Sequence, residues 1–343
     1  NHDVTLSDLF KHPIIKEQKK FLEGLEVRKV NFSMEKAPST CIHDVLESQK
    51  GLFYLQQMDK MNTAYNNPIR ISLSRNVKVE KLENAFQLLA NRHEAFRTSF
   101  KMEKGFIERV VQPRVEFIIE KIKNEQEFIQ PFNLGKAPLI RAAILEEPLQ
   151  KYLFIDAHHI IFDGKSIQIL LNELAILYKD QDVKSLEVQI NDLIYWKNRD
   201  SKQKMQSKEY WLKKFEEPIP VLEFPTDFKR PKEQTFDGST ISFKLDSGLY
   251  KKIKQNLGVE YTLNMYLLAA YYLLLYKYTH QEDIVVGTVL EGRNHHQFEN
   301  QIGMFVNTIA LRNRLNKDKS FKELLDEVKK LTVEALDYQD YSY

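Results

Sequence analysis

Two adjacent histidines followed by an aspartate are the residues of this sequence best suited to chemistry. They lie in the stretch FIDAHHIIFDG, residues 154–164, as His158 and His159, and Asp163 follows four positions after the second histidine. A neutral imidazole exchanges a proton readily near neutral pH. The carboxylate could accept a hydrogen bond from the imidazole and fix its tautomer, or it could pair with an arginine elsewhere in the chain.

The surrounding pattern predicts a strand that ends in a turn. Alternation with period two places His158 on one face and His159 on the other. The face of His159 is otherwise apolar and carries Leu153, Ile155, Ala157 and Ile161. The Asp-Gly pair at 163–164 is typical of a sharp turn. The spacing fits a proton acceptor in an apolar tunnel, but taken alone it favours a satisfied core histidine beside a turn aspartate.

Two other chemistries are not supported by the residues. Adjacent strand residues point to opposite faces, so His158 and His159 cannot ligate one metal ion, and Cys41 is the only cysteine. A serine hydrolase is not indicated either, because the sequence contains no G-x-S-x-G motif. We therefore predict no metal site.

Composition indicates a globular protein of two or three domains. The 343 residues are 43% hydrophobic and 29% charged, and 50 basic against 48 acidic residues leave a net charge of +2. This balance predicts no nucleic-acid or membrane partner. The most apolar helical stretch, 262–278, is too short for a membrane span. A single cysteine is typical of a reducing compartment, so we expect a cytoplasmic protein.

Strand and helix patterns alternate along both halves of the chain, which favours an α/β fold with two lobes. The expected strands are 138–147, 151–161, 238–245 and 283–290. The expected helices are 79–94, 166–180 capped by Ser166, 262–278 capped by Thr262 and buried on most sides, and about 320–336. A stretch rich in proline and charge, 218–234, predicts the boundary between the lobes.

The histidine stretch resembles the HHxxxDG signature of condensation domains from nonribosomal peptide synthetases, which belong to the superfamily of chloramphenicol acetyltransferase. Further stretches resemble family motifs in family order from about residue 42 to the end. These are RHEAFRTSF (92–100), NDLIYW (191–196), EYWLKKF (209–215), QEDIVVGTVLEGRNH (281–295), IGMFVNTIALR (302–312) and YQDYSY (338–343). A match of this length and order is highly specific.

The resemblance implies two acetyltransferase-like lobes in a V-shaped arrangement, with the histidine motif at the crevice between them. It also implies an upstream donor and a downstream acceptor peptidyl carrier protein, with an adenylation domain nearby. Their phosphopantetheine arms would enter a tunnel, and no cofactor would bind to the chain directly. The amine of the acceptor aminoacyl thioester would attack the donor peptidyl or aminoacyl thioester and form an amide.

The resemblance also implies roles for single residues. His159 would orient the attacking amine and either take its proton or only anchor it, and His158 would support the loop. Asp163 would pair with Arg293 of the GR motif and tie the lobes together. Gly164 would let the backbone approach the tunnel.

Two further motif residues support the site less directly. For Arg97, a charged helix end satisfied locally is favoured over a chemical role. Asn307 in FVNT would line the tunnel or satisfy a strand end, and the sequence favours neither.

The family pattern suggests a division of the chain. Residues 1–24 resemble the last helices of a peptidyl carrier protein, 25–40 form a linker, 41–217 the first lobe and 218–343 part of the second lobe. Because family members continue further, we expect an incomplete second lobe with exposed apolar surface, and poor activity of this chain alone. A carrier directly upstream favours a donor of L configuration.

Two alternatives share the fold. An epimerisation domain has the same histidine motif but abstracts an α-proton; the FVNT and YQDY matches and the carrier-like start favour condensation. A non-catalytic recruitment domain usually has a degraded histidine motif, whereas HHIIFDG is intact.

Overall fold

The computed structural model of the chain describes residues 4, 6–25, 36–38, 44–199, 201–233, 235, 238–293 and 295–341, except for the side chains of residues 198, 199 and 201. The chain divides into two compact units. Unit 1 comprises residues 1–32, 201–290 and 308–343, and unit 2 comprises residues 33–200 and 291–307. Both units contain helices and strands, so the predicted α/β class is confirmed.

Unit 2 is built on a four-stranded sheet in the order β1-β6-β5-β4. The strands are β1 (Asn66–Leu73), β4 (Ile119–Ile122), β5 (Ile140–Glu146) and β6 (Lys151–His158). The central strand β6 runs antiparallel to β1 and β5, while β4 is parallel to β5. Strands β5 and β6 fall where the apolar alternation predicts them. A separate two-stranded sheet consists of β2 (Thr98–Glu103) and β3 (Phe106–Val111).

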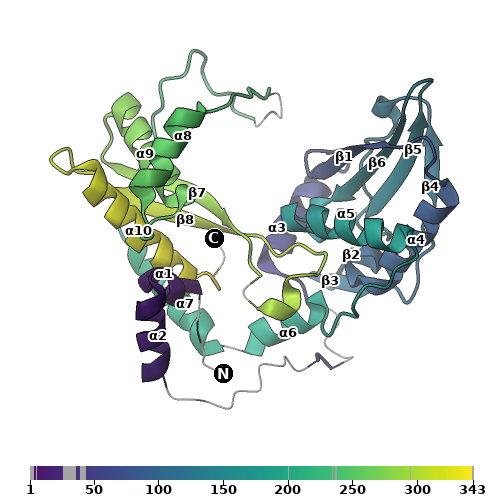
Figure 1. Cartoon of the computed structure of the whole chain (residues 1–343), viewed down its shortest axis with the longest axis horizontal. Coiled ribbons are helices and arrows are strands. Elements are labelled where there is room, and N and C mark those ends of the chain that lie inside the picture. Colours follow the sequence, from purple (N-terminus) through teal and green to yellow (C-terminus); the bar gives the residue numbers. More distant parts are fainter. Residues whose placement is uncertain are drawn as a thin grey trace. The chain divides into compact units, whose positions relative to one another are not determined.

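Helices α4 (Val79–Arg92) and α5 (Gly164–Tyr178) lie along one face of this sheet in Figure 1. The apolar stripes of both helices face the sheet: Leu89 of α4 and Leu170 of α5 belong to the same core cluster as Ile155 of β6. The described residues of unit 2 also form α3 (Glu47–Met58), α6 (Ile190–Arg199) and short 3-10 turns at Glu94–Arg97, Glu125–Glu127, His159–Ile161 and His296–Phe298.

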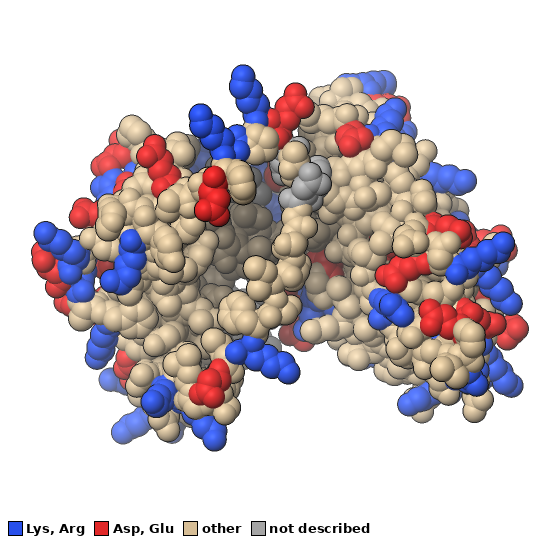
Figure 2. All heavy atoms as spheres, turned by 90° about the horizontal axis from the view of Figure 1, so that it is seen from above, with Lys and Arg blue, Asp and Glu red and all other residues tan. Residues whose placement is uncertain are grey.

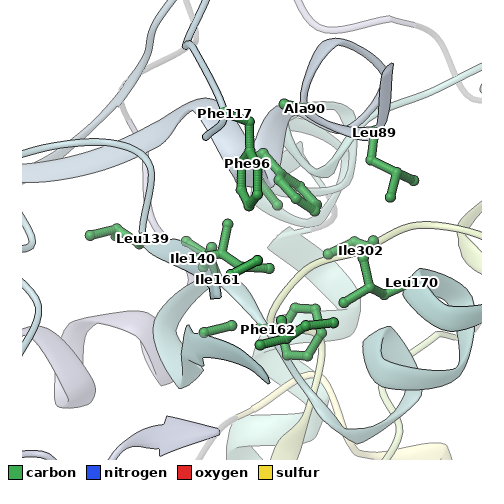
Figure 3. Packing of buried hydrophobic residues seen from close by; sticks show 14 of the residues in the cluster. Leu89, Ala90, Phe96, Phe117, Leu139, Ile140, Ile161, Phe162, Leu170 and Ile302 are labelled. Atoms are coloured by element: carbon green, nitrogen blue, oxygen red, sulfur yellow. The ribbon is translucent and has the colours of Figure 1, made fainter. Parts of the chain in front are cut away.

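Residues 291–307, called the inserted segment below, lie in the chain between two strands of unit 1 but pack within unit 2. Ile302 and Met304 belong to the main core cluster of unit 2. Figure 3 shows Ile302 close to Phe162, which precedes α5, and to Leu170, which lies within α5. The fold thus brings the IGMFVN motif against the end of the HHIIFDG motif.

Unit 1 is organised around α9 (Leu263–Thr279) and α10 (Phe321–Asp337), which pack together. Its other elements are α1 (Leu6–Lys11), α2 (Ile15–Gly24), α7 (Ser201–Lys214), α8 (Ser247–Leu257), β7 (Asp283–Leu290) and β8 (Asn307–Arg314). Thr262 caps α9 as predicted, since its side chain accepts a hydrogen bond from Met265 N. Helix α1 contacts α10, where Lys11 pairs with Asp337.

Three sequence expectations differ from the structure of unit 1. Helix α9 is not buried on most sides: Leu267, Tyr271 and Leu274 are half-exposed, because its core contacts all lie on the opposite side. The stretch 238–245 is not a strand, since no described segment pairs with it. The units also divide the chain differently from lobes at 41–217 and 218–343: residues 201–217 group with unit 1 and the inserted segment with unit 2.

The surface carries no large field of one sign on the face seen in Figure 2, where Lys and Arg alternate with Asp and Glu. This agrees with the net charge of +2. Among the described helices, none has both the length and the apolar character needed to cross a bilayer. The expected linker at 25–40 lies largely outside the described residues.

Candidate active site

The histidine pair lies where β6 ends. The strand stops at His158, and His159 begins a 3-10 turn. His159 N still donates to Tyr65 O at 2.8 Å, but Ile160 N donates to the His158 ring at 3.1 Å instead of continuing the sheet. The prediction that 159–161 extend the strand is therefore wrong, and His159 does not share the apolar row of β6. The side chain of His158 itself ends the strand.

His158 is fully buried and has a partner for each ring nitrogen. Its Nδ1 accepts from Ile160 N, and its Nε2 lies 3.2 Å from Gln56 Oε1, so the proton is on Nε2. Burial, with a smaller contribution from the neighbouring His159, lowers the pKa of His158 from 6.5 to about 4. His158 is thus a neutral group that holds the turn.

His159 has the opposite surroundings. Its ring is partly exposed, and its Nδ1 is buried without a hydrogen-bond partner in the described part of the chain. No hydrogen bond joins its Nε2 to a described residue. An imidazole held by its backbone, with neither nitrogen committed to a neighbour, is free to meet a substrate.

Asp163 caps helix α5. Its Oδ1 accepts from Ser166 N at 2.9 Å and from Ser166 Oγ at 2.7 Å. The helix therefore begins at Gly164, and the prediction that Ser166 is the cap is wrong. The Asp-Gly turn places the carboxylate beside the first backbone amides of the helix, which have no partner within the helix, and an acidic cap is favoured there.

Asp163 also pairs with Arg293, the second of the two alternatives that the sequence left open. Arg293 Nη1 donates to Oδ2 at 2.7 Å and Nη2 to Oδ1 at 2.9 Å, while Phe305 N donates to Oδ2 at 3.1 Å. The pairing implied by the family resemblance is present. Both partners lie in unit 2, so what the pair fastens is the inserted segment.

The glycine before Arg293 permits this arrangement. Gly292 has φ +69°, and a Cβ there would lie 1.9 Å from Phe305 O. Gly164, by contrast, has no atom within 4 Å of where its Cβ would be. The space beside Gly164 is open, as a backbone that faces a ligand requires.

The backbone of 301–305 is held at several points. Arg293 Nη2 donates to Gln301 O at 3.1 Å, and Gly303 N donates to Ser166 Oγ at 3.0 Å. Ile302 N approaches His93 Nδ1 at 3.4 Å. Three motifs far apart in sequence therefore converge on this stretch.

His93 belongs to a buried ionic cluster. Its Nε2 lies 2.7 Å from Glu173 Oε2, and Arg92 donates to the same carboxylate at 3.0–3.2 Å. Burial lowers the pKa of His93, so the ring is neutral with its proton directed at Glu173. Its Nδ1 is then the acceptor that Ile302 N needs.

The other two predicted residues lie at element ends. Arg97 donates to Ala90 O at 3.0 Å and Gln112 O at 2.6 Å, the local arrangement that the sequence favoured. Asn307 is half-buried and is the first residue of β8. The described contacts do not connect Arg97 with the histidine pair.

Sequence reasoning missed two buried glutamines of α3. Gln56 holds His158, and Gln49 Nε2 donates to Ile160 O at 2.9 Å. Both occur in an otherwise amphipathic helix, and a polar residue on its buried face was the available signal. Within the described ranges, no three His, Cys, Asp or Glu side chains are grouped closely enough to hold a metal ion.

Comparisons with known proteins identify the family. The condensation domain family model matches residues 42–343. Gramicidin S synthase 2 of Brevibacillus brevis is 39% identical over 358 residues, which cover 100% of this chain and 8% of that protein. Surfactin synthase subunit 2 of Bacillus subtilis (strain 168) is 36% identical over 351 residues, which cover 99% of this chain and 10% of that protein. The chain belongs to the condensation domain family.

Solved structures agree on the fold. A four-domain nonribosomal peptide synthetase bound to AMP and glycine superposes with a TM-score of 0.77 at 22% identity, over 88% of this chain and 24% of that one. The first condensation domain of the CDA synthetase gives 0.71 at 16% identity, over 88% and 77%. The family and fold class predicted from the motifs are thus confirmed.

The matched family has a characteristic reaction. Condensation domains are acyltransferase-type enzymes that form amide bonds, and the curated relatives are peptide synthetases. The chain spans a tenth or less of the length of the two relatives above. The carrier-protein assignment of residues 1–24 precedes the matched region and stays a prediction.

Proposed function

We propose that this chain joins the amine of an acceptor aminoacyl thioester to a donor peptidyl or aminoacyl thioester, with His159 as the residue that meets the amine. Both substrates would arrive on phosphopantetheine arms of carrier proteins, and an adenylation domain would load the acceptor. The synthetase nature of the relatives supports these partners.

The observation that carries the proposal is the contrast between the two histidines. His158 has both nitrogens engaged and a pKa lowered to about 4, which suits a structural group. His159 is partly exposed with no ring nitrogen engaged by the described residues. Only the second ring is available to a substrate.

The chemistry asked of His159 is modest. A free α-amine titrates near a pKa of about 8, so a useful fraction is already nucleophilic at neutral pH. The amine nitrogen bonds to the thioester carbonyl carbon, the carbon–sulfur bond breaks, and the donor arm leaves as a thiol. The amine proton passes by way of the imidazole, or directly, to the departing sulfur. Holding the amine in line contributes more than basicity does.

The remaining site residues act on the position of His159. Asp163 and Arg293 fasten the turn that follows it, and His158 holds the end of β6 that precedes it. Gly164 leaves open space at the start of α5, where an arm could pass the backbone. Asn307 is the last residue of the inserted segment and the first residue of β8. We assign its side chain to the wall of the tunnel through which the arm passes.

The test is a His159→Ala substitution in a synthetase module that carries this chain, with both carriers loaded. We expect dipeptidyl product to fall at least about 100-fold, as for loss of a positioned acid–base group, while both thioesters persist. His296→Ala, which removes an exposed ring of the inserted segment, serves as the matched control. Product formation at the wild-type rate by His159→Ala would refute the role of His159.

The same module tests for epimerisation. In deuterated buffer, a carrier-bound residue that gained α-deuterium without forming an amide would assign the chain to that reaction. We expect amide formation without such exchange.

A further inference from the structure

The hydroxyl of Ser166 makes more contacts than helix capping needs. Ser166 is fully buried, and its Oγ lies 2.7 Å from Asp163 Oδ1, 3.0 Å from Gly303 N, 3.1 Å from Gly303 O and 3.4 Å from Arg293 Nη2. A hydroxyl has one donor and two acceptor sites. It therefore accepts from Gly303 N and donates to Asp163 or to Gly303 O.

Capping does not explain these contacts, because Asp163 already caps α5 through Ser166 N. The hydroxyl instead connects α5 to the inserted segment. Two of the contacts on that segment come from the start of α5: Ser166 Oγ accepts from Gly303 N, and Asp163 Oδ2 accepts from Phe305 N at 3.1 Å. The segment then leads directly into β8 at Asn307.

The residue opposite the hydroxyl is a glycine for a steric reason. A Cβ on Gly303 would lie 2.7 Å from the Phe305 ring and 3.0 Å from Ile190 Cδ1. The backbone of the inserted segment thus comes close enough for a direct bond to a short side chain. A serine is the smallest residue that can supply it.

We propose that Ser166 is a positioning residue for amide formation: its hydroxyl fixes the inserted segment, and with it Asn307, against the turn that bears His159. This inference rests on the proposed function of His159. It assigns to Ser166 a role that neither its helix position nor the capping of α5 requires.

The first arm of the test measures the contact without using activity. Amide hydrogen exchange in the 343-residue chain is compared between wild type and Ser166→Ala. We expect the exchange rate of the Gly303 amide to rise at least about 10-fold, because the variant loses one buried hydrogen bond. The amides of β5 should keep their exchange rates. Ser207→Ala is the matched control, because Ser207 is a buried helical serine whose Oγ has no hydrogen-bond partner among the described residues.

The second arm measures the reaction in the loaded module. A displaced tunnel wall misaligns bound substrate, so kcat should fall about 10- to 100-fold in Ser166→Ala while KM for the acceptor stays within about twofold. Ser166→Cys keeps the side-chain volume with a weak hydrogen-bonding group and should behave like the alanine variant. It replaces Ser166→Ala if that variant does not fold.

Three results would overturn the proposal. They are unchanged exchange at Gly303, exchange that rises across all of unit 2 as for plain destabilisation, and raised exchange at Gly303 with wild-type kcat. If the proposed function itself is wrong, His159→Ala retains product, and the exchange arm still reports on the Ser166 contact. The two failures are therefore distinguishable.

Discussion

Arg293 donates two hydrogen bonds to Asp163 across a sequence separation of 130 residues, and both side chains are almost completely buried. This pair joins the GR motif to the HHIIFDG motif within unit 2. Because Asp163 also caps α5, one carboxylate sets the helix start, the end of the turn after His159 and the path of the inserted segment. Among the described residues, Arg293 is the one cation that forms an ion pair with this carboxylate.

Removal of Arg293 should therefore destabilise unit 2 strongly. We expect Arg293→Ala to lower the free energy of unfolding by about 3–5 kcal/mol, because it leaves a buried carboxylate unpaired. Arg293→Lys keeps the charge but loses the paired geometry and should fall in between. Urea denaturation in a Trp211→Phe background measures this, since Trp196 in α6 is then the only tryptophan and lies in unit 2.

The control for this prediction is an ion pair on the surface. Lys50 and Glu47 pair at 2.8 Å with both side chains substantially exposed. Lys50→Ala should leave the unfolding midpoint nearly unchanged. A loss for Arg293→Ala no larger than that for Lys50→Ala would contradict the role given to the buried pair.

The two glycines beside this pair should respond oppositely to alanine. Gly292→Ala places a methyl group on Phe305 O at an unfavourable φ, so we expect a loss of about 3 kcal/mol in the same assay. Gly164→Ala meets open space and should stay within about 0.5 kcal/mol of wild type. If the backbone at Gly164 faces an arm, product formation should nevertheless fall in Gly164→Ala, and an unchanged rate would count against that role.

The lowered pKa of His158 predicts how the free energy of unfolding depends on pH. Its pKa is about 4 in the folded chain and 6.5 when unfolded, so the unfolded state binds its proton first as pH falls. The contribution of the neutral ring is complete above pH 6.5 and is lost progressively toward pH 4. A shift of this size corresponds to about 3 kcal/mol. Unfolding free energies of unit 2 measured from pH 7 to pH 4.5 should therefore show this decline.

Substitution isolates the contribution of His158. In His158→Asn the side-chain oxygen can still accept from Ile160 N, but nothing titrates, so the decline from this residue should disappear. His280→Asn, at an exposed position with φ +56° that asparagine tolerates, should leave the decline intact. An equal pH slope in wild type and His158→Asn would show that other groups produce it.

Local patterns predicted most elements of the fold because periodicity reports which face is buried. Helices α4, α9 and α10 and strands β5, β6 and β7 all lie close to their expected ranges. The failures concern features that local sequence does not contain. The stretch 238–245 alternates like a strand, but a strand needs a partner, and none of the described segments supplies one. The exposed side of α9 depends in the same way on what packs against it.

The site was accessible to sequence reasoning only in part. The motifs identified the residues, and the family resemblance gave the pairing of Asp163 with Arg293. The contact between Ser166 and Gly303 spans 137 residues and involves backbone atoms, which side-chain patterns do not report. Gln56 was missed for a related reason, since a buried amide in a helix does not reveal that it faces an imidazole.

The last prediction separates a functional histidine from a structural one by stability. His159 keeps a buried Nδ1 to which none of the described residues donates or accepts a hydrogen bond, an arrangement that costs stability in the folded state. We expect His159→Ala to unfold at the same urea concentration as wild type or a higher one, with a gain of up to about 1 kcal/mol, while amide formation is lost. The assay is the same Trp196 fluorescence measurement on unit 2.

His158→Ala supplies the comparison. It leaves Ile160 N and Gln56 without their partner and opens space in the core, so we expect a loss of about 1–3 kcal/mol. The HHIIFDG motif would then contain His158, which stabilises the fold, directly before His159, which serves activity at a cost in stability. If His159→Ala instead destabilises unit 2 as much as His158→Ala does, the second histidine is a structural residue as well. Destabilisation of unit 2 would then explain why the His159→Ala variant forms less product.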